Sequence, residues 1–194
     1  MSIRRAVAAL GLMLVLGGCT SAPAVDDGQA QATAPTTSVT HLAACPRQPD
    51  RKAAGAELLP ALSFDCPGGG SLDLGKAPGV PTVVNLWGSW CPPCRAEMPV
   101  LEQFAGVAGN AVRVVGVISK DGLPQADSFA ADSGVTFPSA FDGQGQLMTD
   151  LGLNVLPYTY FLDADGALTY TQVGPVASVE KLRGLVAEHL GVRL

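Results

Sequence analysis

The chain has 194 residues, of which 47% are hydrophobic and 15% are charged, and its formal net charge is -5. This length and apolar content are enough for one core of ordinary size, so we expect one domain with extensions. An acidic chain without a basic patch argues against nucleic-acid binding, and we expect its acidic side chains to lie on a solvated surface.

The first residues have the pattern of a lipoprotein signal peptide. Arg4 and Arg5 precede an apolar stretch, residues 6–16, that is too short to span a bilayer. The Leu-Gly-Gly-Cys sequence that ends at Cys19 resembles a lipobox, in which the cysteine is lipidated and begins the mature chain. We therefore predict a lipoprotein signal peptide at residues 1–18 and an extracytoplasmic protein anchored to the outer face of the cell membrane through Cys19. An uncleaved anchor or an ordinary secretory signal is the alternative.

Two segments follow before the predicted domain. Residues 19–41 are rich in alanine, threonine, serine, glutamine and proline, so they are predicted to form a flexible tether. Residues 42–70 form an N-terminal extension that contains Cys45 and Cys66. Outside the cytoplasm this pair favours a structural disulfide, which would stabilise the fold by about 3 kcal/mol for a loop of this length. A second redox function for the pair is the alternative.

The most informative stretch follows an apolar run, residues 81–86, that is predicted to be a buried strand. Here Trp90-Cys91-Pro92-Pro93-Cys94 opens a segment of helical periodicity. Free amides and the positive end of the helix dipole lower the pKa of a thiol at a helix N-terminus, so we expect Cys91 to be the exposed, attacking thiolate. Cys94, buried one turn further on, is expected to resolve the mixed disulfide by closing the ring.

Half of a zinc site is the other interpretation of a C-x-x-C pair. Zinc would need a second pair of ligands, and the two histidines of the chain, His41 and His189, lie near opposite ends of the sequence. We therefore predict no metal and no cofactor other than the redox-active disulfide of Cys91 and Cys94.

Together with Asn85, Trp87 and Glu97, the Trp90–Cys94 motif resembles the thioredoxin superfamily. Within it, the motif is most similar to the membrane-anchored TlpA/ResA/CcmG group of thiol-disulfide oxidoreductases. The resemblance implies that residues 71–194 form a thioredoxin-like domain, an α/β three-layer sandwich with a mixed central β-sheet.

Glu97 is a third predicted catalytic residue. It lies three residues after Cys94, so it shares a helix face with the resolving cysteine. Burial beside apolar neighbours would raise the pKa of its carboxyl group and allow proton exchange near neutrality. The resemblance supports this role, because ResA-like proteins carry a functional glutamate at the matching position. The alternative is a carboxylate that only complements the helix dipole.

The resemblance also implies a substrate-binding stretch later in the chain. Pro157 matches the cis-proline that faces the C-x-x-C pair, and the backbone of Leu156 would hydrogen-bond an extended peptide. Trp90, beside the attacking cysteine, is the remaining predicted substrate-binding residue. An ordinary trans proline at the head of a strand is the alternative for Pro157.

The order of strand, helix, strand and helix through residues 81–132 predicts parallel pairing through right-handed crossovers, and the turn signal Ala164-Asp165-Gly166 predicts a hairpin between the strand after Pro157 and the strand at residues 167–173. Apolar runs and turn signals predict an edge strand within residues 58–64, strands at residues 113–118, after Pro157 and at 167–173, and helices at residues 124–132, 146–152 and 179–190.

The resemblance implies a reductase of protein disulfides, notably those of the haem-binding cysteines of apocytochrome c. Electrons would come from a membrane thiol transporter of the CcdA/DsbD type. A disulfide-forming oxidase of secreted proteins would use the same residues and would differ in reduction potential. From another class, a copper chaperone or thiol-dependent binding module would use Cys91 and Cys94 as ligands or contacts without turnover.

Overall fold

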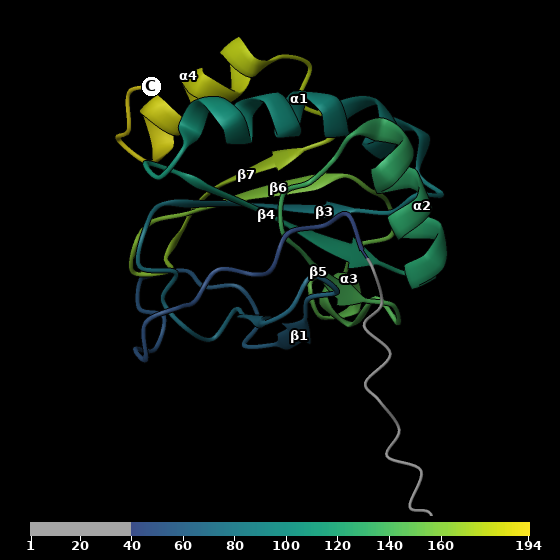
Figure 1. Ribbon diagram of the computed structural model, residues 1–194. Helices are drawn as coiled ribbons and strands as arrows, with labels where there is room; N and C mark the ends of the chain where they lie inside the picture. The colour runs from purple at the N-terminus through teal and green to yellow at the C-terminus, as the bar shows by residue number, and fades with distance from the viewer. Residues whose placement is uncertain (1–39) are drawn as a thin grey trace, which may run out of the picture. The chain divides into compact units, whose positions relative to one another are not determined.

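The computed structural model describes residues 40–194 (Figure 1). The predicted signal peptide, the predicted lipidation site at Cys19 and nearly all of the predicted tether lie outside the described residues. Within residues 40–194, no helix is both long and apolar enough to cross a membrane.

A five-stranded mixed sheet forms the centre of the described part of the chain (Figure 1). Its strands are β3 (Thr82–Trp87), β4 (Arg113–Ser119), β5 (Ser139–Asp142), β6 (Tyr158–Leu162) and β7 (Leu168–Val173). They lie in the order β5-β4-β3-β6-β7, with β3, β4 and β5 parallel and with β6 antiparallel to both β3 and β7. Every residue of the central strand β3 is buried, as expected for an apolar strand that is covered on both faces.

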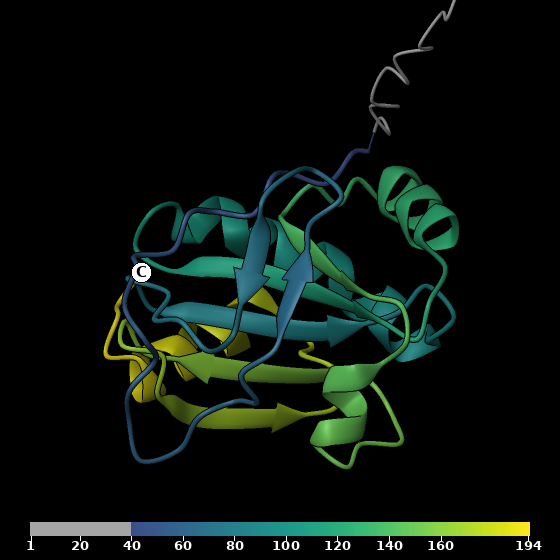
Figure 2. The same ribbon diagram turned by 90° about the horizontal axis from the view of Figure 1, so that it is seen from below.

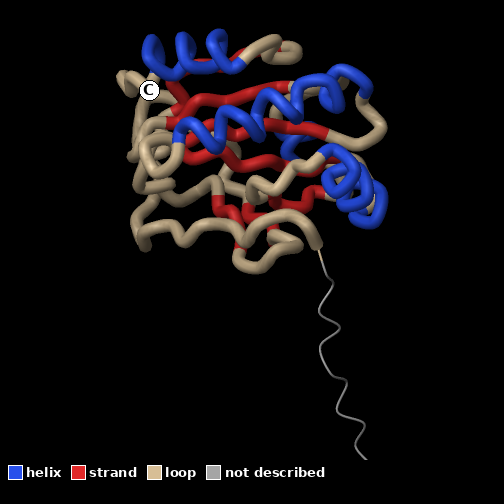
Figure 3. The backbone as a smooth tube through the Cα atoms, turned by 45° about the horizontal axis from the view of Figure 1, so that its top comes forward, coloured by secondary structure: helices blue, strands red, loops and turns tan. Residues whose placement is uncertain are grey.

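Helices lie on both faces of this sheet, and a hairpin covers much of one face. The helices are α1 (Pro92–Ala108), α2 (Leu123–Ser133), α3 (Gln146–Asp150) and α4 (Val179–His189). Helices α1 and α4 lie side by side on one face (Figures 1 and 3). The antiparallel hairpin of β1 (Ser63–Asp65) and β2 (Ser71–Asp73) lies on the opposite face with α3 (Figure 2). The prediction of a three-layer α/β sandwich with a mixed central sheet is confirmed.

Local sequence explains why α1 begins directly after Cys91. Cys91 is its N-cap residue, and Pro92 and Pro93 occupy the first two helical positions, where no backbone donor is required. Apolar side chains at helical spacing then turn one face of α1 towards the sheet, including Met98, Leu101 and Phe104.

The first described residues are attached to α2 and to the loop that precedes β5. Thr40 Oγ1 donates a hydrogen bond to Asp127 Oδ1 on α2 at 2.5 Å. Two residues later Leu42 is buried in the core, and the Ala43 N–H donates to the carbonyl oxygen of Thr136 at 2.8 Å. Thr40 therefore contacts the folded domain, although the sequence places it in the tether.

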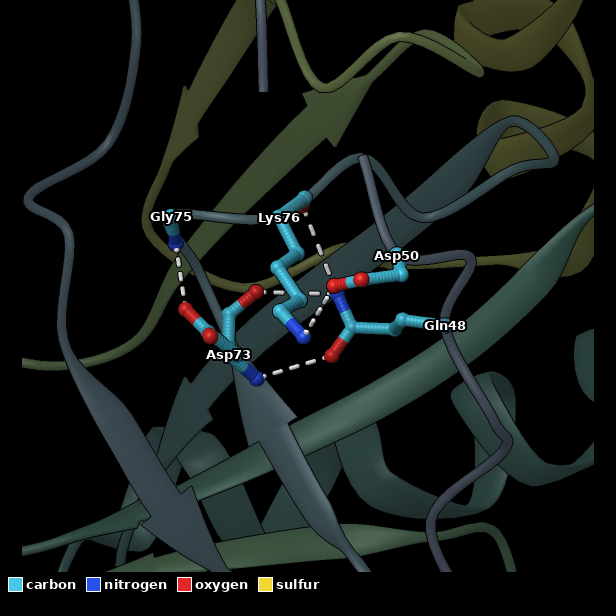
Figure 4. Close-up of polar contacts among 5 residues, drawn as sticks. All are labelled: Gln48, Asp50, Asp73, Gly75 and Lys76. Atoms are coloured by element: carbon cyan, nitrogen blue, oxygen red, sulfur yellow. Dashed lines mark hydrogen bonds and ion pairs between the residues drawn. The ribbon is translucent and has the colours of Figure 1, made fainter. Parts of the chain in front are cut away.

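The side chain of Gln48 fastens the N-terminal extension to the end of β2 (Figure 4). Its Nε2 atom donates to the carbonyl oxygen of Asp73 at 2.8 Å, and its Oε1 atom accepts from the Asp73 N–H at 2.8 Å. In the same turn, Asp73 Oδ1 accepts from the Gly75 N–H at 2.9 Å, and Lys76 Nζ lies 3.1 Å from Asp50 Oδ1. The amide of Gln48 thus takes the place of a paired strand residue.

The extension also carries a disulfide between Cys45 and Cys66, with a Cα–Cα distance of 5.8 Å. Both cysteines are buried. The predicted boundary between residues 42–70 and residues 71–194 falls inside the β1–β2 hairpin. The extension is therefore continuous with the predicted domain, because β1 on one side of the boundary pairs with β2 on the other.

Candidate active site

The two cysteines of the C-x-x-C motif lie at the junction between β3 and α1. They form a disulfide with a Cα–Cα distance of 5.3 Å, and Cys91 Sγ accepts a hydrogen bond from the Cys94 N–H at 3.2 Å. This donor and the positive end of the helix dipole favour a thiolate at Cys91 once the disulfide is reduced.

The expectation of an exposed attacking cysteine is wrong for the disulfide form. Cys91 is 2% exposed and Cys94 is fully buried. The reason is that the Cys91 sulfur is bonded to Cys94 and turned towards the Cys94 N–H rather than towards solvent.

Leu156 and Pro157 lie beside this junction. The peptide bond between them is cis, and β6 begins at the next residue. Because Tyr158 pairs with Leu86 on β3, Pro157 lies beside the end of β3, where the chain turns into the C-x-x-C motif. Among the described residues, neither the N–H nor the C=O of Leu156 has a backbone hydrogen-bond partner.

The side chain of Trp90, the residue before Cys91, is half-exposed. This side chain is held by the end of β4, because Nε1 donates to the carbonyl oxygen of Ser119 at 3.3 Å. Asp121, in the loop after β4, accepts from the Ser89 N–H at 2.5 Å and from Ser89 Oγ at 3.1 Å. A Cβ atom at Gly88 would lie 2.5 Å from Trp90 Nε1, so only glycine leaves room for this indole position.

Glu97 lies on the face of α1 that is turned towards the sheet, and it is 1% exposed. Its Oε1 atom accepts from Asn85 Nδ2 at 2.8 Å, and its Oε2 atom accepts from the Val176 N–H at 2.9 Å. Burial of the carboxyl group raises the pKa of Glu97 from 4.5 to about 7, although the hydrogen bonds from Val176 and Asn85 lower it in part. A carboxyl group with this pKa can accept or release a proton near neutrality.

Asn85 and Thr159 complete a buried polar cluster beneath α1. Both side chains are fully buried, on the paired strands β3 and β6. Asn85 Nδ2 donates to Thr159 Oγ1 at 3.0 Å as well as to Glu97. From the sequence, Asn85 was named only as one of the residues that carry the thioredoxin resemblance, and Thr159 was not identified as part of the site.

A cavity of about 430 Å³ adjoins the motif on the side of α2. The Arg95 guanidinium group lies 4.6 Å from the centre of the Phe129 ring and donates to the carbonyl oxygen of Ser89 at 3.2 Å. Val155, the residue before Leu156, is 55% exposed. The cavity is lined by polar and charged side chains, including Arg95 and Asp132, and by the apolar side chains of Pro124 and Phe129.

The other predicted site residues lie apart from this cluster or outside the description. Cys45 and Cys66 belong to the extension, whose β1–β2 hairpin lies on the face of the sheet opposite α1 (Figure 2). Cys19 lies outside the described residues. In residues 40–194, no group of three or more histidine, cysteine, aspartate or glutamate side chains is placed to hold a metal ion.

A C-x-x-C disulfide at a helix N-terminus, beside a cis-proline and on a mixed five-stranded sheet, defines the class of thioredoxin-fold thiol-disulfide proteins. The chain belongs to the Redoxin family, whose sequence model matches residues 53–186. This finding confirms the resemblance that the motif carries.

Relatives of known sequence or structure agree with this assignment. The thiol:disulfide interchange protein DsbE of Escherichia coli (strain K12) is 38% identical over 97 residues, which are 50% of this chain and 51% of that protein. The chain therefore aligns with about half the length of such relatives. A secreted disulfide oxidoreductase of Mycobacterium tuberculosis, described as homologous to DsbE, is 28% identical with a TM-score of 0.57 over 66% of this chain and 96% of that one. StoA from Bacillus subtilis is 26% identical with a TM-score of 0.55 over 63% of this chain and 96% of that one.

Proposed function

We propose that this protein is an extracytoplasmic thiol-disulfide oxidoreductase that reduces disulfides in other proteins. The observation that carries the proposal is the grouping of three features at one end of the sheet. These are the Cys91–Cys94 pair at the N-terminus of α1, the cis-Pro157 beside it, and the buried Glu97 behind it. The name of the DsbE relative, a thiol:disulfide interchange protein, supports the same activity.

In the reduced protein the Cys91 thiolate attacks one sulfur of a substrate disulfide. The substrate S–S bond breaks, a mixed disulfide forms with Cys91, and the released substrate thiolate takes up a proton. Glu97 accepts the proton of the Cys94 thiol, and the Cys94 thiolate attacks the Cys91 sulfur. The second substrate thiolate leaves, so two electrons pass to the substrate and the Cys91–Cys94 disulfide remains.

The edge formed by Leu156 and Pro157 is suited to hold the substrate during this exchange. The main-chain groups of Leu156 have no backbone partner in the described part of the chain and can pair with an extended peptide. The half-exposed indole of Trp90 offers an apolar contact next to Cys91. Recognition of this kind depends on the main chain of the substrate more than on its side chains.

The oxidised protein then needs two electrons from a second dithiol. We propose that a membrane thiol transporter of the CcdA/DsbD type supplies them and that apocytochrome c, through its haem-binding cysteines, is the substrate. Anchoring through a lipid on Cys19 would keep the protein on the membrane face where such partners meet. These steps rest on the resemblance of the Trp90–Cys94 motif to the TlpA/ResA/CcmG group.

A turnover assay tests the activity. The protein with dithiothreitol should accelerate insulin reduction at sub-stoichiometric concentration, and Cys91→Ser should not. Equal rates for wild type and Cys91→Ser would overturn the enzyme proposal and leave a binding module, such as a copper chaperone, as the function to test.

The direction of electron flow is tested by the reduction potential of the Cys91–Cys94 pair in defined thiol-disulfide buffers. A value below about -220 mV supports a reductase, because the pair would then donate electrons. A value above about -150 mV would contradict this direction and indicate an oxidase that makes disulfides in secreted proteins.

A further inference from the structure

We propose that Asn85 is a positioning residue for proton transfer: its side-chain amide holds the Glu97 carboxylate and sets the pH at which Glu97 exchanges a proton with Cys94. The inference deepens the proposed function. It rests on that function for the transfer of the Cys94 proton to Glu97 during disulfide exchange. The contact between the two side chains does not depend on that function.

Both carboxylate oxygens of Glu97 are held by N–H donors. Asn85 Nδ2 lies 2.8 Å from Oε1, and the Val176 nitrogen lies 2.9 Å from Oε2. The donors come from β3 and from the segment before α4, so the carboxylate is fixed from two directions. Glu97 is itself one turn after Cys94 on α1, and the two donors therefore decide which way the carboxylate points relative to the resolving cysteine.

Within residues 40–194, no hydrogen bond or ion pair joins Glu97 to a charged side chain. Its hydrogen-bond partners are the uncharged amide of Asn85 on β3, which also contacts Thr159 on β6, and the backbone N–H of Val176 before α4. Cys94, which shares this helix face, is disulfide-bonded in this structure and gains a titratable thiol only on reduction. Burial thus raises the pKa of Glu97, and hydrogen bonds alone offset that rise, to about 7. Of these hydrogen bonds, the one from Asn85 is made by a side chain and can be removed by substitution.

Thr159 is the second hydrogen-bond partner of the Asn85 amide. The two N–H groups of Nδ2 are directed at Glu97 Oε1 and Thr159 Oγ1, and Asn85 Oδ1 has no hydrogen-bond partner among the described residues. This orientation suits an ionised Glu97, because a charged acceptor strengthens the hydrogen bond. With the amide turned over, Oδ1 would face Oε1 and could accept a hydrogen bond from the O–H group of a neutral Glu97.

An amide at position 85 can therefore be a partner for either protonation state of Glu97. A carboxylate at the same position would place a second negative charge within hydrogen-bond distance, and the two acids would titrate as a coupled pair with separated steps. The amide keeps Glu97 as a single proton acceptor with one midpoint. This explains why a side chain that cannot itself take the Cys94 proton lies at the centre of the cluster.

The test is a ¹³C NMR titration of the Glu97 carboxyl carbon in the oxidised protein, with Glu97→Gln to assign the signal. Asn85→Leu removes the amide donor, and we expect the titration midpoint to rise by about one pH unit, since a charge-assisted hydrogen bond is stronger than a neutral one by about that amount. Ser139→Ala, which removes a buried polar group on β5 that does not contact Glu97, is the control and should leave the midpoint where it is.

Asn85→Asp provides a second variant of nearly the same size. It should give two carboxyl titrations, the later of them above the wild-type midpoint. An unchanged Glu97 midpoint in Asn85→Leu, or a single unshifted titration in Asn85→Asp where the leucine variant does not fold, would overturn the proposal. A change of equal size in Ser139→Ala would also overturn it.

The pH profile of insulin reduction separates this inference from the proposed function. If Asn85 acts through Glu97, the profile of Asn85→Leu should shift in the same direction as the NMR midpoint. A shifted midpoint with an unshifted profile would overturn the role of Asn85 while the reductase function stands. Failure of the wild type to reduce insulin would overturn the function, and the NMR titration would still decide whether Asn85 holds the carboxylate.

Discussion

Glu97→Gln is expected to make the oxidised protein more stable above neutral pH. The pKa of Glu97 is about 7 in the folded protein, compared with 4.5 for an ordinary glutamate, a difference of about 2.5 pH units. One pH unit corresponds to about 1.4 kcal/mol, so ionisation of Glu97 lowers the free energy of unfolding by about 3 kcal/mol.

The sign follows from proton binding. Because its pKa is raised on folding, Glu97 binds its proton more tightly in the folded protein than in the unfolded chain. The stability that this group contributes is fully present below pH 4.5 and is lost as the pH rises through about 7. The uncharged variant has no proton to lose, so its stability should lack this decline.

The buried cluster can accommodate the new amide. The Val176 N–H can still donate to the remaining carbonyl oxygen of the substituted side chain. If the Asn85 amide turns over, its Oδ1 atom, which has no partner among the described residues, can accept from the new NH₂ group and from Thr159. The substitution therefore removes the charge without leaving Val176 or Thr159 unpaired.

Urea unfolding of the oxidised protein at pH values from 5 to 9 is the assay. Wild type and variant should have similar free energies of unfolding near pH 5, and the variant should exceed wild type by about 2–3 kcal/mol at pH 8. Glu188→Gln, at an exposed glutamate on α4, controls for the change in net charge. Parallel pH curves for wild type and Glu97→Gln, or a less stable variant at pH 8, would refute the reasoning.

Two further substitutions test other parts of the structure. Gly88→Ala should displace the Trp90 indole, because the new Cβ would lie 2.5 Å from Nε1, and we expect slower insulin reduction with the fold retained. Unchanged turnover and unchanged iodide quenching of tryptophan fluorescence would contradict this. The double variant Cys45→Ser and Cys66→Ser should lower the free energy of unfolding by about 3 kcal/mol, since the bridge closes a loop with a sequence separation of 21. Its insulin reduction at 25 °C should be close to wild type, and a loss of turnover without a loss of stability would point to a redox role for this pair.

Most of the central sheet could be predicted from the sequence because its strands are apolar and bounded by turn residues. The strand predicted at residues 113–118 is β4, and the one at residues 167–173 is β7. β5 was not predicted, because its four residues, Ser139–Asp142, include a serine and an aspartate and follow a proline. The edge strand expected within residues 58–64 is instead the short β1, which gains its partner only from β2.

The candidate site was predictable where its chemistry is local and was missed where it depends on tertiary contact. Cys91 and Cys94 are found from their spacing, and burial of Glu97 follows from its helix face. The Val176 N–H that holds Glu97 comes from 79 residues further along the chain, and a backbone donor leaves no mark in the sequence. Asp121, which fixes the loop before Trp90, was likewise missed. In the sequence it resembles the other aspartates of the loops, and only the fold shows that it accepts from the Ser89 N–H.

The Cys45–Cys66 bridge also determines how a mechanical load would travel through the protein. A pull on the N-terminal end of the described chain reaches Cys45 after the contact of Thr40 with α2. From Cys45 the shortest covalent path runs through the disulfide to Cys66 and then into the turn between β1 and β2. Residues 46–65, including the Gln48 clamp, therefore bear almost no tension, and a pull cannot unravel them one by one. The cross-link lets the far side of the sheet take up force while the loop that covers it stays slack.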